Sequence, residues 1–310
     1  MKKLNLYSAL KKGGFRGALL CFLIILLNSC SFGWYQFAFT DDTVDDRVKT
    51  YDALDPSDTP QVSGTGSYSF LVVSDMHFGS GRNDVNQDDF YAKFTELVHS
   101  GEAEKIPRFV INLGDTSDDG STEYFEQYNE WCARVKSIVL AQTGDSSFKV
   151  YALIGNHDLY HNGQKNFIKL VYPNKYAYYF DFAWDNSTEG FGFYFFDSAN
   201  GTLSNTQYEL VSEKMKSDSR PKIVLTHYPV YAGGHPFMLM HNTLERAKIL
   251  SLFADNSVKA IFAGHAHQHF YYDYGDFFEY VIQSYRASHV CLLVTVNEAD
   301  GSVTEKLIEF

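Results

Sequence analysis

The chain has 310 residues, of which 45% are apolar and 16% aromatic, enough for a large core and too apolar for a disordered chain. Its formal net charge is −12, and five of its 26 bases lie in the first sixteen residues, which hold no acid. The remaining 21 bases face 38 acids, which excludes binding of duplex nucleic acid by general attraction and means that phosphate chemistry needs local positive charge.

The N-terminal segment is typical of an export signal. After the bases comes the apolar run of residues 18–27, about half as long as a bilayer span. It ends in Leu27-Asn28-Ser29-Cys30, which resembles the lipobox of bacterial lipoproteins, in which the chain is cut before a Cys that carries a diacylglyceryl group. We therefore expect a signal peptide over residues 1–29, lipidation of Cys30, and a membrane-anchored lipoprotein outside the cytoplasm, in the periplasm or at the cell surface. The alternative is an uncleaved transmembrane anchor, because apolar residues resume at Phe32.

The next stretch is polar and contains two Asp pairs, Pro56 and Pro60. This composition predicts a tether or linker over residues 30–66 and a folded domain over residues 67–310. The domain holds two cysteines, Cys132 and Cys291, which we expect to be buried small hydrophobes. The sequence does not decide whether these two cysteines form a disulfide.

Short apolar runs then alternate with amphipathic stretches. In the first half, strands are expected at 69–73, 109–113 and 149–154, and helices at 88–100 and 122–141. In the second half, helices are expected at 206–216 and 243–254, and strands at 178–182, 191–196, 223–226, 260–263, 270–274, 279–284, 290–296 and 305–310. This order predicts an α/β fold with two sheets face to face and helices on their outer sides.

Five short polar motifs stand at or just beyond the ends of expected strands. Loops beyond the carboxyl ends of strands are where α/β folds place ligands, and glycines there let the chain turn tightly and approach an ion closely. In chain order the motifs are Asp75-Met76-His77, Gly114-Asp115-Thr116-Ser117-Asp118, Gly155-Asn156-His157-Asp158, Thr226-His227-Tyr228-Pro229 and Gly264-His265-Ala266-His267.

All donors in these motifs are oxygen or nitrogen atoms, and none is a thiolate. Imidazole with carboxylate suits Mn, Fe, Zn or Co better than Ca or Mg alone. One bridging carboxylate can hold two ions about 3.5–4 Å apart, the two-metal geometry for phosphoryl transfer. The donor set therefore predicts a metal site.

The motifs together resemble the calcineurin-like metallophosphoesterase superfamily. Its pattern is D-x-H, G-D, G-N-H-[DE], a lone H and G-H-x-H, and this chain has every element in that order between Asp75 and His267. The resemblance implies a four-layer αββα sandwich of two mixed sheets flanked by helices. It also implies a hydrolase of small phosphate esters, either phosphodiesters or phosphomonoesters, with two divalent or trivalent metal ions (Mn, Fe or Zn).

Carried over position by position, the resemblance assigns one metal to Asp75, His77, Asp115 and His267, and the other to Asp115, Asn156, His227 and His265. His157 corresponds to the family's non-ligand His, which meets the phosphate or the leaving group. Asp118 stands where some members have an Asp that hydrogen-bonds that His. The implied reaction uses a metal-bridging hydroxide as nucleophile, while His157, oriented by Asp118, protonates the leaving oxygen.

Residues just past the motifs are candidates for substrate binding. Arg82 follows the first motif in a Gly-rich loop, and His161 and His235 follow the third and fourth. The alternative for both histidines is an ordinary solvated loop position. We expect Asp158 to brace its motif loop rather than to bind metal.

A second class of function stays open, namely a non-catalytic surface lipoprotein that reuses the fold for binding. A chain of that kind would usually have lost a ligand or the catalytic His, and every one of these residues is present in this sequence.

Overall fold

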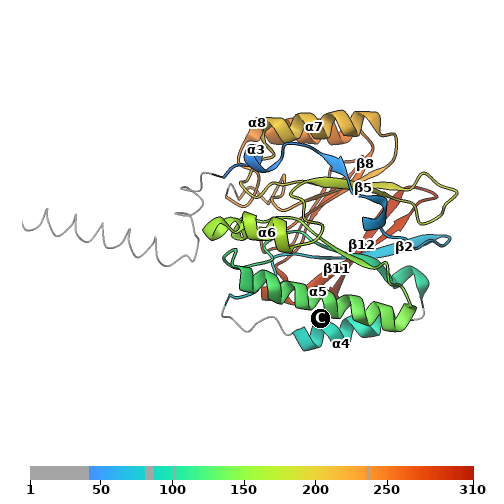
Figure 1. The fold of residues 1–310 in the computed structure, drawn as a ribbon. Coiled ribbons are helices and arrows are strands. Elements are labelled where there is room, and N and C mark those ends of the chain that lie inside the picture. Colours follow the sequence, from blue (N-terminus) through green and yellow to red (C-terminus); the bar gives the residue numbers. More distant parts are fainter. Residues whose placement is uncertain (1–41, 81–86, 101, 236) are drawn as a thin grey trace, which may run out of the picture. The chain divides into compact units, whose positions relative to one another are not determined.

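Two β-sheets lie face to face in the computed structural model, with helices on the outer side of each sheet (Figure 1). The structure describes residues 42–80, 87–100, 102–235 and 237–310. The expected α/β fold of two mixed sheets flanked by helices is confirmed.

The first sheet has five strands in the order β12-β11-β2-β3-β4. Its parallel part consists of β2 (Ser67–Val73), β3 (Pro107–Asn112) and β4 (Lys149–Ala152). The antiparallel strands β11 (Val290–Asn297) and β12 (Ser302–Glu309) complete it. The three parallel strands therefore end at one edge, which is the edge that carries the first three motifs.

The second sheet has seven strands in the order β1-β5-β6-β7-β8-β10-β9. Four of them are parallel neighbours, and these are β6 (Phe191–Phe195), β7 (Lys222–Thr226), β8 (Val258–Ala263) and β10 (Phe278–Val281). The others are β1 (Asp52–Ala53), β5 (Tyr178–Phe182) and β9 (Phe270–Asp273).

The central strands are apolar at nearly every position because both of their faces are covered. In β2, Phe70 and Val72 belong to the core between the sheets, whereas Leu71 and Val73 belong to the core beneath the outer helices. Aromatic rings fill much of the space between the sheets; Phe70, for example, stacks on Phe109 with ring centroids 5.1 Å apart. The alternation of side chains along each strand thus serves two cores at once.

Helices cover the outer face of each sheet (Figure 1). Over the five-stranded sheet lie α4 (Gln87–Val98), α5 (Thr122–Thr143) and α6 (Gln164–Leu170), whose apolar faces join one core. Over the seven-stranded sheet lie α3 (Val44–Arg47), α7 (Ser204–Ser217) and α8 (Thr243–Asp255). The short elements are η1 (Pro56–Asp58), η2 (Ala103–Lys105), η3 (His157–Asn162) and α9 (Tyr285–Ser288).

The stretch expected to be a linker is folded from residue 42 onward. Val44, Val48 and Tyr51 are buried in the core under α7 and α8, and β1 pairs with β5. The sequence expectation of a tether over 30–66 followed by a domain over 67–310 therefore differs from the structure. The apolar residues of this stretch are too widely spaced to show a period, yet Val44, Val48 and Tyr51 fill gaps in a core built by distant elements.

Arg47 ties this stretch to the rest of the fold. Its guanidinium forms a buried ion pair with Asp197, 2.6 Å between Nε and Oδ2, and also contacts Asp42. Burial by itself would lower the pKa of Arg47, but the charge of Asp197 outweighs it and raises that pKa. Asp197 directly precedes Ser198, whose hydroxyl accepts hydrogen bonds from the backbone of the fourth motif.

We predict that Arg47→Met lowers the free energy of unfolding by about 3–5 kcal/mol, because Asp197 would remain buried without its partner. Chemical denaturation followed by circular dichroism measures this. The matched control is Lys49→Met, an exposed residue two positions on, which should change stability by less than about 0.5 kcal/mol. Equal stability of the Arg47 variant and the parent protein would contradict an integral role for this stretch.

Cys132 and Cys291 are both buried, as expected, and both are free thiols. Burial raises the pKa of the Cys132 thiol to about 12, so this thiol stays protonated at neutral pH. Within the described residues, no helix is both long and apolar enough to cross a membrane. The expected signal peptide and Cys30 lie outside the described residues.

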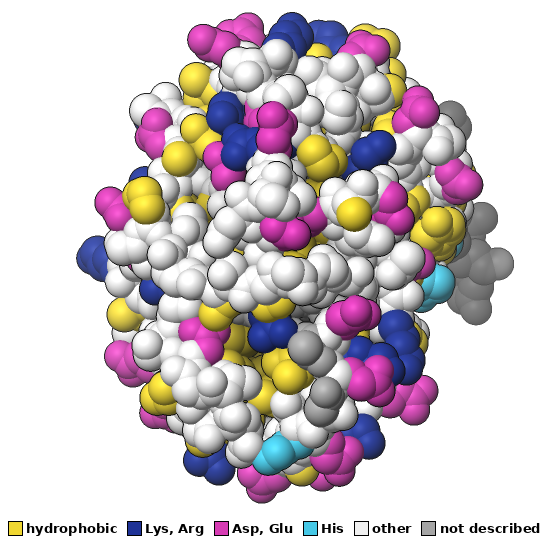
Figure 2. Space-filling view, turned by 90° about the vertical axis from the view of Figure 1, so that its right-hand side faces the viewer, with side chains coloured by type: hydrophobic (Ala, Val, Ile, Leu, Met, Phe, Trp, Pro, Cys, Tyr) yellow, Lys and Arg dark blue, Asp and Glu magenta, His cyan; other side chains and the backbone are white. Residues whose placement is uncertain are grey.

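Acidic and basic side chains are interspersed on the face of the molecule drawn in Figure 2. That face shows no broad basic area of the kind that attracts duplex nucleic acid.

Candidate metal centre

The first two motif loops run side by side beyond the ends of β2 and β3. The backbone N–H of Asp75 donates to the carbonyl of Gly114 at 3.0 Å, and that of His77 donates to the carbonyl of Asp115 at 2.9 Å. A parallel bridge between Phe78 and Ser117 extends the pairing. These bonds continue the β2–β3 ladder past the sheet edge and so bring the side chains of both motifs together.

Five of the seven expected metal ligands have a left-handed backbone, with φ between 47° and 62°, and these are Asp75, His77, Asp115, His265 and His267. This conformation is uncommon for residues other than glycine and costs free energy. Strained positions of this kind cluster at functional sites, and here the strain lies in three separate loops that converge.

Two motif glycines permit the close approach of these loops. A Cβ on Gly155 would lie 2.2 Å from Oδ1 of Asp115, and a Cβ on Gly264 would lie 2.7 Å from Oδ2 of Asp75. Any side chain at either position would therefore displace a carboxylate of the site.

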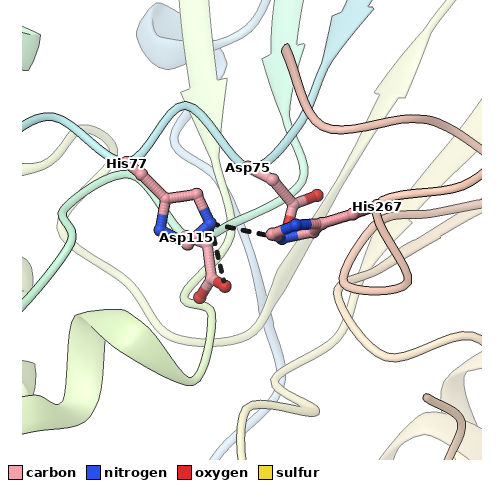
Figure 3. Close-up of side chains that lie close together, drawn as sticks. All are labelled: Asp75, His77, Asp115 and His267. Atoms are coloured by element: carbon pink, nitrogen blue, oxygen red, sulfur yellow. Dashed lines mark hydrogen bonds and ion pairs between the residues drawn. The ribbon is translucent and has the colours of Figure 1, made fainter. Parts of the chain in front are cut away.

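The first group of donors consists of Asp75, His77, Asp115 and His267, and the candidate ligand atoms lie within 4.8 Å of one another. Figure 3 shows their side chains pointing toward one another, with Asp75 and His77 on one loop and Asp115 and His267 on two others. Nε2 of His77 lies 3.3 Å from Nε2 of His267 and 3.7 Å from Oδ2 of Asp115, and Nε2 of His267 lies 3.1 Å from Oδ1 of Asp75.

The second group shares Asp115 with the first. It contains Asp115, His227 and His265, again with candidate ligand atoms within 4.8 Å. Nε2 of His227 lies 3.4 Å from Oδ1 of Asp115 and 3.0 Å from Oδ1 of Asn156, so the amide joins this group. The structure thus brings all seven expected ligands into two groups that meet at one carboxylate.

Two of the imidazoles are oriented through their second nitrogen. Nδ1 of His227 lies 2.8 Å from the carbonyl of Leu113, where it donates, and Nδ1 of His77 lies 3.2 Å from Oδ1 of Asp118. Nε2 of both rings then faces Asp115. Histidines that bind metals are commonly held by a hydrogen bond from the other ring nitrogen to a carbonyl or a carboxylate. His227 has this bond, whereas Nδ1 of His77 has an ion-pair contact with Asp118 without hydrogen-bond geometry.

His157 lies outside these two groups, although it forms a third group of candidate ligand atoms with His77 and Asp118. Its ring meets that of His77 edge to face, with centroids 4.5 Å apart. Its Nδ1 lies 2.8 Å from the backbone carbonyl of Asp118 but 3.9 Å from the carboxylate of that residue. The backbone of Asp118 therefore orients His157, whereas the sequence led us to expect that its side chain would. The carboxylate turns instead toward His77, because the positive-φ turn of the first motif places that ring beside it.

Burial and charge have opposite effects on the pKa values of Asp115 and His227, and the same effect on that of His265. Burial by itself would raise the pKa of Asp115, but the imidazole of His227 holds it well below its usual range. Burial would lower the pKa of His227, yet Asp115 raises it to about 9. Burial and the charge of His227 together lower the pKa of His265 to about 3. The negative charge of Asp115 therefore favours a positive charge beside it, which a bound metal cation would supply.

The donor atoms fit a cation better than they fit each other. Oδ1 of Asp75 is buried, and within the described part of the chain its 3.1 Å ion-pair contact with Nε2 of His267 lacks hydrogen-bond geometry. The two Nε2 atoms of His77 and His267 face one another at 3.3 Å, where only one of them can donate. Buried lone pairs that converge without donors cost free energy, and a cation between them removes that cost.

Asp158 braces the loops, as the sequence predicted. Its carboxylate accepts hydrogen bonds from the backbone N–H groups of Thr116 (3.3 Å), Ser117 (2.8 Å) and Gly155 (2.9 Å). Burial, followed by the charge of Asp115, raises the pKa of Asp158 to about 7. This residue therefore joins the second motif to the third without taking a place among the donors.

The three expected substrate-binding residues lie outside both donor groups. Arg82 falls outside the described residues. His161 is exposed, and its Nδ1 lies 3.2 Å from the carbonyl of Asp119. His235 is exposed in the loop after the fourth motif, where its ring centroid lies 6.4 Å from that of Phe270.

One cationic residue of the site was missed by the sequence reasoning. Nη1 of Arg286 lies 3.4 Å from Oδ1 of Asp118. The residue lies two positions after the expected strand 279–284, so the rule that placed the five motifs at strand ends also applies to it. It was passed over because no motif of the family resemblance contains it.

Comparison with known proteins agrees with the fold and the site. Residues 68–269 match the family described as calcineurin-like phosphoesterase. The chain is 27% identical over 201 residues to a protein of Fibrobacter succinogenes named "Probable cyclic nucleotide phosphodiesterase", covering 63% of this chain and 71% of that one.

Two solved structures share the fold. A dimetal phosphatase from Danio rerio aligns with a TM-score of 0.51 and 15% identity, over 79% of this chain and 100% of the other. GAP50 of Plasmodium, described as the anchor in the inner membrane complex, aligns with a TM-score of 0.54 and 14% identity, over 79% and 89%. The fold and the convergent Asp and His donors define a metal-binding phosphoesterase scaffold. This chain belongs to the calcineurin-like phosphoesterase family and is a hydrolase of that class.

Proposed function

We propose that the protein is a binuclear metal-dependent hydrolase of phosphate esters, acting on phosphodiesters or phosphomonoesters. The observation that carries this proposal is the position of Asp115, whose two carboxylate oxygens face the two donor groups separately. Oδ2 faces His77 and Oδ1 faces His227. A carboxylate shared in this way is the arrangement that holds two ions close together.

In this proposal Asp75, His77 and His267 hold one ion, and Asn156, His227 and His265 hold the other, with Asp115 common to both. Bound cations would lower the pKa of water and offset the negative charge of the phosphate oxygens. The protein supplies rigid donors for them, since nearly all of these side chains are buried and several are held by backbone hydrogen bonds.

His157 is proposed as the general acid. Its Nδ1 donates to the carbonyl of Asp118, which leaves Nε2 as the nitrogen that can pass a proton to the leaving oxygen. The ring is partly exposed, with 18% of the side chain accessible, so a substrate can reach it. The backbone N–H of His157 donates to Oδ1 of Asp115 at 2.8 Å, which fixes the ring beside the donor groups.

The test is a hydrolysis panel on protein that lacks the residues before Ser31, after chelation and reloading with Mn, Zn, Fe or Mg. Chromogenic monoesters and diesters come first, and cyclic nucleotides are included because the Fibrobacter relative bears that name. We expect no turnover after chelation and recovery with one or more of the first three metals. No turnover of any ester with any of these metals would overturn the proposal in favour of a binding protein built on the same fold.

We also propose that the protein is exported and anchored to a membrane by a lipid on Cys30. The support is the order of bases, apolar run and Leu27-Asn28-Ser29-Cys30 in the sequence. Because a single acyl chain anchors only weakly, stable tethering requires at least two.

Mass spectrometry of the native protein should show Cys30 as the mature N-terminus, carrying a diacylglyceryl group. Cys30→Ser should leave an uncut precursor, whereas the control Cys21→Ser, within the apolar run, should be processed normally. An intact start at Met1 in the parent protein would contradict the proposal.

A further inference from the structure

Arg286 reaches the metal centre from a strand that carries no family motif. Because β10 runs parallel to β8, its carboxyl end lies at the same sheet edge as the loop with His265 and His267. The chain after β10 is tied to the first motif, since Ser284 Oγ donates to the carbonyl of Asp75 at 2.9 Å and the N–H of Tyr285 donates to that of Ser74 at 2.9 Å. The position of Arg286 is therefore set by the backbone of the site.

The guanidinium of Arg286 and the ring of His157 both lie near the same oxygen of the Asp118 carboxylate. Nη1 of Arg286 is 3.4 Å from Oδ1 of Asp118, and Nδ1 of His157 is 3.9 Å from the same oxygen. The Arg286 side chain is 16% accessible and that of Asp118 is 32% accessible. The cation and the proposed general acid thus border the same partly open part of the site.

The contact between Arg286 and Asp118 is a weak one for an arginine. The N–O distance is long, only one nitrogen of the guanidinium takes part, and both side chains are partly accessible to water. Asp118 also faces Nδ1 of His77 at 3.2 Å, so its charge is shared. A guanidinium has five N–H donors in a planar fork that matches two phosphate oxygens.

A fixed positive charge beside the donor groups favours binding of an anionic substrate, in addition to the cations proposed above. The three carboxylates of Asp75, Asp115 and Asp118 surround the site, and the whole chain carries a net charge of −12. Both features repel a phosphate group. Arg286 is the residue of fixed positive charge that the described structure places in contact with this cluster.

We propose that Arg286 binds a non-bridging oxygen of the substrate phosphate, exchanging its contact with Asp118 for the substrate. This inference rests on the proposed hydrolysis of phosphate esters and adds a substrate-binding residue to that site. The competing role is structural, in which Arg286 only holds Asp118 in place beside His77.

The experiment measures binding of inorganic phosphate to the full-length, Mn²⁺-loaded protein by isothermal titration calorimetry. We expect Arg286→Met to raise the Kd for phosphate by about 10- to 100-fold, the usual effect of losing a charge-assisted contact, with unchanged manganese content. Arg286→Gln, which keeps N–H donors near Asp118, should weaken phosphate binding to a similar degree. The control Arg134→Met removes the same charge from an exposed position on α5 and should leave the Kd unchanged.

The Asp118→Asn background separates the two roles. If Arg286 binds phosphate directly, adding Arg286→Met to this background still raises the Kd at least about tenfold. If Arg286 acts only through Asp118, the double variant binds phosphate as the Asp118→Asn protein does, and the inference is overturned. Parent-like phosphate binding by Arg286→Met, or a loss that follows lost manganese, also overturns it. Failure of the parent protein to hydrolyse any ester would instead refute the proposed function, so the two failures are distinct.

Discussion

Asp115→Asn should abolish hydrolysis and remove metal from both donor groups. The carboxylate of Asp115 is buried and faces His77 through one oxygen and His227 through the other. An amide has no negative charge and only one acceptor oxygen, so it cannot serve two cations as a carboxylate does. We expect a loss of metal affinity larger than the about 10- to 100-fold that removal of an outer partner costs.

Metal content by elemental analysis and rates on a chromogenic ester decide this prediction, and circular dichroism shows whether the variant is folded. The matched control is Asp119→Asn, four residues on, whose carboxylate accepts from the backbone of Ser121 and lies outside both donor groups. The control should keep both metal and activity. A folded Asp115→Asn protein with two bound metals and normal turnover would refute the bridging role.

His157→Gln should keep near-normal metal content while turnover falls by about 10²–10⁴-fold, the typical cost of losing a positioned acid. The loss should be smaller for nitrophenyl esters, whose leaving group needs little protonation, and larger for alkyl or ribose leaving groups. Rates on both kinds of substrate, together with metal analysis, measure this. Equal losses for both leaving groups, or loss of metal, would show that His157 is a phosphate binder or a ligand and not the acid.

For Asp118→Asn, the structure predicts a different effect from the one expected on the sequence alone. If the carboxylate oriented His157, this variant would reproduce the His157→Gln pattern weakly. The carboxylate lies 3.2 Å from Nδ1 of His77, and His157 is held by the backbone carbonyl, which the substitution leaves in place. We therefore expect Asp118→Asn to lower metal affinity by about 10- to 100-fold and to affect both kinds of leaving group equally.

The sequence by itself determined the family and the fold class, and it indicated the candidate donors that the structure brings together. Each motif sits within a few residues of an apolar strand run, and both signals are local, so spacing along the chain is enough to find them. The ladder between β2 and β3 then brings Asp75 and Asp115 together without further information. The bracing role of Asp158 followed in the same way, because its partners lie in the motif loops themselves.

Only the tertiary structure decided which further residues lie beside the donor groups and which residues before β2 belong to the core. Arg286 reaches the cluster because β10 pairs in parallel with β8, and strand order is set by contacts between residues far apart in sequence. Val44 and Tyr51 are core residues because they fill gaps left by α7, α8 and the seven-stranded sheet, which no local period can reveal. The direction of the Asp118 carboxylate likewise depends on backbone angles and on neighbours that a linear motif does not specify.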